Sequence, residues 1–251
     1  MLEAALSDIL SICADADTLA AASADHIISI LSDAVRQSGT ASLALSGGKT
    51  PGLYFPLLAS EPRRSAVPWQ HLHVFWTDER CVPPEHAESN YGMAWRLWLS
   101  HVPIPADNIH RMRGEINPPA AAREYAEELL GFFAGMPRFD LILLGIGTDG
   151  HTASLFPGTT ALDAQEYACA VYVPQLSSWR ITLTLPVLNN ARTAIVVASG
   201  TDKASIMEKL RNAGTDSTYP AGRVRLRDGK LIWLIDAEAA MLMHYERAEK
   251  L

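Results

Sequence analysis

The chain has 251 residues, of which 48% are hydrophobic and 20% are charged, a composition typical of a globular protein and not of a disordered one. The formal net charge is -7 at pH 7 and the 21 basic residues are scattered, so we expect no nucleic-acid partner. No apolar stretch of the sequence reaches the length of a membrane span, and we expect no membrane partner.

Short apolar runs alternate along the chain with helical patterns. In chain order, the patterns predict a helix at 18–37 that ends at Gly39, a strand at 41–46, a helix after Thr50 and Pro51, a strand at 72–77, helices at 89–99 and 119–133, strands at 141–144, 170–173 and 180–185, a helix at 187–190, a strand at 193–198, a helix at 201–210 and a strand at 231–235. This alternation predicts a doubly wound α/β fold with a mostly parallel sheet. We expect a single domain over residues 1–251, with a boundary in the proline-rich stretch 105–118 as the alternative.

Cysteine usage and the first residues bear on the compartment. Cys13, Cys81 and Cys169 are an odd number without metal-ligand spacing, so we expect reduced thiols and no metal site. No Lys or Arg precedes Arg36, so the N-terminus lacks the charged start of a signal peptide. We therefore expect a cytoplasmic protein, and nothing in the sequence indicates an obligate protein partner.

The first candidate site is the loop SGGKTP at 46–51, which follows a predicted strand. Thr50 and Pro51 are suited to begin a helix, with Thr50 as its cap and Pro51 in its first turn. The free N–H groups of such a junction can bind an anion. A Walker A loop would need a glycine where Leu43 stands, so the loop favours the phosphate of a small molecule over a nucleoside triphosphate. A plain tight turn is the alternative.

Charged residues crowd the end of the strand predicted at 72–77, and a cluster of surface ion pairs would explain them without any function. Arg80 is a candidate site residue, because a guanidinium can bind phosphate or stabilise a developing oxyanion. Asp78 of the same segment is a candidate substrate-binding residue. Arg180 and Lys203 are further cations near the ends of predicted elements.

The segment LGIGTDGHTASLFPG at 144–158 has the glycine spacing of a dinucleotide-binding turn. Pro157 interrupts the helix that such a turn requires, and no acidic residue ends the next strand, so we expect no NAD site and no cofactor. The glycines still place His151 at the carboxyl edge of the predicted sheet, where open α/β folds bind ligands. An imidazole there is suited to proton transfer at neutral pH, and a hydrogen-bonded structural histidine is the alternative.

Four segments, SGGKTP, WTDERCVPPEHAESNYG, LGIGTDGHTASLFPG and RITLTLPVLNNAR, occur in this order within residues 40–235. Together they resemble the 6-phosphogluconolactonase family of the non-propeller type. The resemblance implies a Rossmann-like, three-layer α/β/α core and metal-independent hydrolysis of 6-phospho-D-glucono-1,5-lactone in the oxidative pentose phosphate pathway. The small-molecule partner would then be a phosphorylated sugar lactone.

The resemblance also assigns roles to residues. It places the catalytic histidine at His151, and the arginine and phosphate-site positions at Ser46, Gly47, Gly48, Lys49, Thr50, Arg80, Arg180 and Lys203. The chemistry agrees, because a δ-lactone is an activated ester that needs only a general base for water and donors for the oxyanion. We expect His151 to be the base, Asp149 to orient it and Arg80 to meet the oxyanion or nearby hydroxyls.

Two rival functions remain. The resemblance to glucosamine-6-phosphate deaminase would require a glutamate five residues after the histidine, where this chain has Phe156, and a tyrosine in place of Arg80. A sugar-phosphate sensor on the same fold is the non-enzymatic alternative. Such regulators usually carry a DNA-binding domain, and the residues before the first motif show no convincing helix-turn-helix and no basic face.

Overall fold

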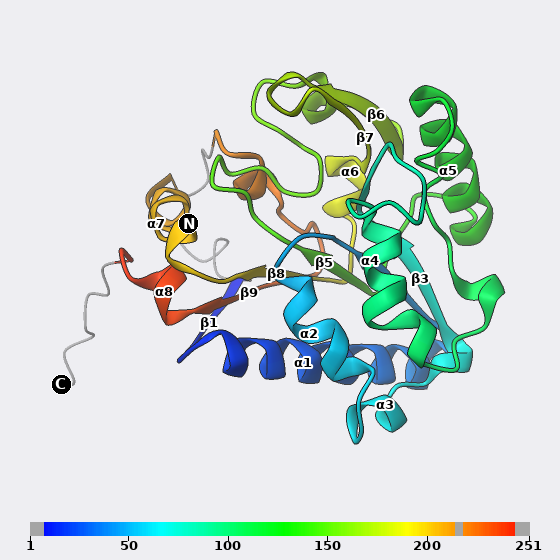
Figure 1. Ribbon diagram of the computed structural model, residues 1–251, viewed down its shortest axis with the longest axis horizontal. Helices are drawn as coiled ribbons and strands as arrows, with labels where there is room; N and C mark the ends of the chain where they lie inside the picture. Colours follow the sequence, from blue (N-terminus) through cyan, green and yellow to red (C-terminus); the bar gives the residue numbers. More distant parts are fainter. Residues whose placement is uncertain (1–7, 214–217, 244–251) are drawn as a thin grey trace.

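A six-stranded parallel sheet forms the centre of the protein, in a computed structural model that describes residues 8–213 and 218–243 (Figure 1). Its strands, in spatial order, are β1 (Asp8–Cys13), β9 (Lys230–Asp236), β8 (Thr193–Ala198), β5 (Leu141–Leu144), β2 (Ala41–Leu45) and β3 (Leu72–Trp76). Every residue of β2 and β5 is buried, as expected for inner parallel strands covered on both faces. The predicted α/β fold with a mostly parallel sheet is confirmed.

A second, antiparallel sheet holds three strands, β4 (Asp78–Arg80), β7 (Ser178–Leu183) and β6 (Ala168–Val173). The sequence predicted β6 and β7 as strands without separating them from the parallel sheet, and it missed β1 and the short, charged β4. Thr77 joins the two sheets, because its N–H donates to Leu45 O and its carbonyl accepts from Leu183 N, each at 2.7 Å. This junction brings β4 and β7 to the carboxyl edge of the parallel sheet.

Helices cover both sheets, with bounds α1 (Ala16–Ser38), α2 (Pro51–Leu58), α3 (Arg63–Ala66), α4 (Asn90–Leu97), α5 (Pro118–Phe133), α6 (Leu185–Leu188), α7 (Ala204–Ala213) and α8 (Ala237–Ala240). Helix α1 packs against β1, β2, β5 and β9, while α5 packs against β6 and β7 (Figure 1). Among the residues described, none of the helices has both the length and the apolar character to cross a bilayer.

The ends of two helices test the predicted capping. Gly39 ends α1 in the left-handed region at φ 81°, as its position predicted. The predicted start of α2 is confirmed in position, because Thr50 stands at the N-cap and Pro51 lies in the first turn, but Thr50 has helical angles and its side chain makes no capping hydrogen bond. The turn starts one residue earlier, since Gly52 N donates to Lys49 O at 3.1 Å.

Candidate active site

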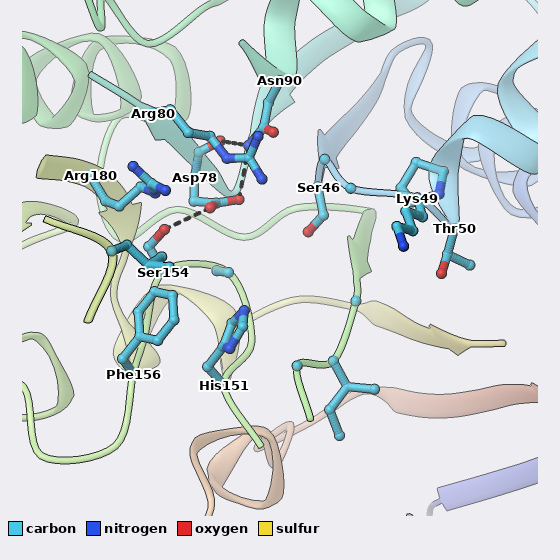
Figure 2. Close-up of a pocket in the computed structure, with 18 of the residues that line it drawn as sticks. Ser46, Lys49, Thr50, Asp78, Arg80, Asn90, His151, Ser154, Phe156 and Arg180 are labelled. Atoms are coloured by element: carbon cyan, nitrogen blue, oxygen red, sulfur yellow. Dashed lines mark hydrogen bonds between the residues drawn. The ribbon is translucent and has the colours of Figure 1, made fainter. Parts of the chain in front are cut away.

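A pocket of about 430 Å³ opens at the carboxyl edge of the parallel sheet, between the segments that follow β2, β3, β5 and β8 (Figure 2). Ten of the predicted site residues line it: Ser46, Gly47, Gly48, Lys49, Thr50, Asp78, Arg80, His151, Arg180 and Lys203. Residues that line it without having been singled out as ligands include Asn90, Ser154, Leu176, Ser199 and Asp202. The structure thus brings together segments from four predicted motifs.

His151 is held from behind by Asp149. The Nδ1 atom lies 2.5 Å from Asp149 Oδ1, and the same oxygen accepts the backbone N–H of His151 at 3.1 Å. An ionised carboxylate can only accept, so Nδ1 carries the proton and Nε2 is the nitrogen left for the pocket. Gly147 makes room for this pair, because a Cβ at that position would lie 2.1 Å from His151 Nδ1.

Phe156 fixes the other side of the imidazole. Its ring stacks on that of His151 with centroids 4.1 Å apart and planes 27° apart. Together with Asp149, this contact limits rotation of the histidine about both side-chain bonds. His151 keeps about a third of its side chain exposed, at 31%, which leaves it open to water and to a ligand.

Two arginines converge on one wall of the pocket, because Arg80 of β4 and Arg180 of β7 are register partners. Arg80 Nη1 donates to Glu88 O at 2.5 Å, and Arg180 Nη1 donates to Ser178 Oγ at 2.6 Å. Burial lowers the pKa of Arg180, and the nearby charge of Arg80 lowers it further. Two guanidiniums so close together favour an anion between or beside them.

Asp78 lies beside these arginines and is almost completely buried (Figure 2). Its Oδ2 accepts from Ser154 Oγ at 2.7 Å, and its Oδ1 accepts from Asn90 Nδ2 at 3.3 Å. These bonds fix the carboxylate at the floor of the pocket.

The loop 46–50 forms the opposite wall in Figure 2. Ser46 Oγ lies 2.7 Å from Thr77 Oγ1 and donates to Leu143 O at 2.8 Å, which ties the loop to the sheet. Gly48 has φ 102°, a conformation that favours glycine. Lys203 Nζ contacts Asp202 Oδ2 at 3.1 Å, so this cation is partly neutralised before any ligand binds.

Asn90 and Ser154 are the neighbours of Asp78 that sequence reasoning missed. Both belong to quoted motifs, but each contacts Asp78 only through the fold, from the start of α4 and from the segment after His151. Residue type alone gives no signal for such contacts. Within the described ranges, no group of three or more His, Cys, Asp or Glu side chains has the arrangement of a metal site.

The fold and the pocket define an α/β protein with a cationic ligand site and a histidine–aspartate pair at the carboxyl edge of its parallel sheet. Residues 14–233 match the family described as glucosamine-6-phosphate isomerases/6-phosphogluconolactonase, and the chain belongs to this family. The resemblance found in the four motifs is confirmed at the level of the family.

Individual relatives agree with this assignment. The 6-phosphogluconolactonase of Nostoc sp. is 38% identical over 231 residues, which cover 90% of this chain and 94% of the relative. The crystal structure of devB protein superposes with a TM-score of 0.88 at 37% identity, covering 94% of this chain and 100% of that one. The 6-phosphogluconolactonase of Trypanosoma cruzi has a TM-score of 0.84 at 27% identity, covering 95% and 97%.

Proposed function

We propose that this protein hydrolyses 6-phospho-D-glucono-1,5-lactone to 6-phosphogluconate, a step of the oxidative pentose phosphate pathway, with His151 as general base. The observation that carries the proposal is the pairing of His151 with Asp149 at 2.5 Å, since His151 lines a pocket whose other walls carry two arginines and the loop 46–50. The name of the Nostoc relative supports the same substrate.

In the proposed reaction, His151 Nε2 takes a proton from a water molecule as the water oxygen attacks the lactone carbonyl. The new C–O bond turns the carbonyl oxygen into an oxyanion, for which Arg80 is the nearby cation. When the tetrahedral intermediate collapses, the ring C–O bond breaks and the imidazolium returns its proton to the departing ring oxygen. Asp149 keeps the imidazole in the required tautomer and orientation throughout.

The phosphate gives the substrate its orientation in this proposal. Residues of the loop 46–50, together with Arg180 and Lys203, are the groups proposed to bind it. Binding at that end of the substrate would hold the carbonyl against His151 and so convert binding energy into correct geometry.

The reaction class can be tested against the deaminase alternative. We expect lactone hydrolysis well above the spontaneous rate and no ammonia from glucosamine 6-phosphate, because Phe156 cannot transfer a proton where the deaminases use a glutamate. A pH-stat measures the first reaction and a coupled ammonia assay the second. Enzyme-dependent ammonia with only background loss of lactone would overturn the assignment, and binding without either turnover would favour the sensor.

Activity should survive chelation. Water activation by His151 and charge stabilisation by Arg80 need no metal, so exhaustive EDTA treatment is expected to leave kcat unchanged. The measurement compares treated and untreated enzyme in the same pH-stat assay, with a zinc hydrolase as the positive control for chelation. Loss of turnover that zinc or magnesium restores would contradict the proposed mechanism.

A cytoplasmic location is part of the proposal. Its support is the unpaired state of Cys13, Cys81 and Cys169, which suits a reducing compartment.

A further inference from the structure

Asn90 carries a buried side-chain amide between the two walls of the pocket. Its Nδ2 donates to the backbone carbonyl of Asp78 at 2.8 Å and to Asp78 Oδ1 at 3.3 Å. Both partners can only accept, which fixes the nitrogen on this side of the amide and the oxygen on the other. Both of these hydrogen bonds of the amide nitrogen are therefore made to Asp78.

The amide oxygen faces the loop 46–50. A Cβ built on Gly47 would lie 1.7 Å from Asn90 Oδ1 and 2.3 Å from its Cγ, so Gly47 turns an α-hydrogen towards the oxygen. The Oδ1 atom is buried and accepts no hydrogen bond among the described residues. A Cα–H···O contact with Gly47 is the interaction that this geometry allows.

The backbone of Asn90 is held as firmly as its side chain. The buried carboxylate of Glu79 accepts the N–H of Asn90 at 2.7 Å, the N–H of Tyr91 at 2.8 Å and the hydroxyl of Ser89 at 3.1 Å. Burial raises the pKa of Glu79, and the backbone N–H groups oppose that rise. The start of α4 is thus anchored to β4, which holds Asn90 beside Asp78.

Asn90 lines the pocket, but its amide oxygen is buried against Gly47. Its oxygen cannot donate to a phosphate, and its nitrogen already donates to two oxygens of Asp78. The contacts through which its side chain would act on the reaction are therefore those with Gly47 and Asp78.

We infer that Asn90 is a positioning residue, whose amide sets the distance between Asp78 and the loop 46–50 through its close contact with Gly47. The inference rests on the proposed function, in which this loop binds the phosphate. The inference also explains why the loop has glycine at two positions. Gly48 is needed for its backbone angle, whereas Gly47 is needed because Asn90 occupies the space that a side chain would fill.

A double-mutant cycle between Gly47→Ala and Asn90→Ala tests the inference. In the wild-type background, Gly47→Ala must displace the amide and break its bonds to Asp78, so we expect kcat/KM for the phosphorylated lactone to fall by about tenfold or more. In the Asn90→Ala background the methyl group has room, and the same change is expected to cost less than about threefold. Asn90→Ala alone should raise KM for the phosphorylated lactone more than KM for unphosphorylated gluconolactone.

Gly48→Ala is the matched control. A Cβ there meets nothing within 4 Å, so its cost comes from the backbone angle and Asn90→Ala should not relieve it. The inference would be overturned if Gly47→Ala lowered kcat/KM equally in both backgrounds. It would also be overturned if Asn90→Ala reduced the loss caused by Gly48→Ala as much as the loss caused by Gly47→Ala.

The same four proteins can be compared without lactone, by their free energies of unfolding in urea and by their affinities for inorganic phosphate in calorimetric titration. If the wild type fails to hydrolyse the lactone, the proposed function fails. Coupling between Gly47→Ala and Asn90→Ala in unfolding and phosphate binding would still support the positioning role, and additive effects in both would refute it.

Discussion

Replacing His151 with alanine is expected to lower kcat by about 10² to 10⁴, the usual contribution of a positioned general base. Substrate affinity should change little, because the phosphate and the ring hydroxyls would be bound by other groups. The variant should also fold normally, since the imidazole is partly exposed and its bonded partner Asp149 lies at the surface. Steady-state kinetics with urea unfolding as a parallel measurement distinguish a lost base from a lost fold.

Two further variants make this experiment specific. His26→Ala removes an exposed histidine of α1, far along the chain from the pocket residues, and should leave kcat unchanged. Asp149→Asn keeps the size of the side chain but removes its charge, so it should cost less than His151→Ala and leave the protein folded. A His151→Ala variant that unfolds early but turns over normally would make His151 a structural residue.

The sequence predicted the parallel sheet better than the antiparallel one, and the reason is physical. Strands β2 and β5 are buried on both faces and appear as continuous apolar runs. Strand β7 is also nearly continuous in burial after Arg180, although it pairs antiparallel with β4 and β6. A buried run therefore predicts a strand without predicting its partner, and β4 is too short and too charged to give any periodic pattern.

The candidate site was predictable where a motif ends a strand. His151, Arg80 and the loop 46–50 all follow strand ends, and parallel strands collect such ends at one edge. The positioning role proposed for Asn90 was missed because it depends on contacts with Asp78 and Gly47, which the fold brings together. Thr50 stands at the predicted N-cap position but makes no capping hydrogen bond, and its own backbone angles are already helical.

The phosphate is the second point at which a large effect is expected, because it lies at the opposite end of the substrate from the bond that breaks. Binding energy gained there can hold the carbonyl in place, so its loss should lower kcat/KM and need not act on KM alone. Charge-assisted hydrogen bonds contribute roughly 1.5 to 3 kcal/mol each, or about one to two decades in kcat/KM. Unphosphorylated gluconolactone should accordingly be a poor substrate.

Arg180→Ala and Lys203→Ala should each lower kcat/KM for the phosphorylated lactone far more than kcat/KM for the unphosphorylated one. The phosphate then serves as one partner of a double-mutant cycle and the cation as the other. Lys209→Ala, an exposed cation of α7 that does not line the pocket, is the matched control and should affect both substrates equally little. Arg180→Lys keeps a charge in the buried wall and separates loss of charge from loss of packing.

Of the two variants, Arg180→Ala tells more about which group of the substrate each cation binds. Arg180 is the register partner of Arg80, so the two guanidiniums share one wall, and either could meet the phosphate or the oxyanion. If Arg180 binds the phosphate, Arg180→Ala should lower kcat/KM by about one to two decades for the phosphorylated lactone and leave it almost unchanged for the unphosphorylated one. If it meets the oxyanion, both lactones should lose the same fraction of kcat, because the reacting carbonyl is common to them. Equal fractional losses for both cations would therefore remove Arg180 and Lys203 from the phosphate site and leave that role to the loop 46–50.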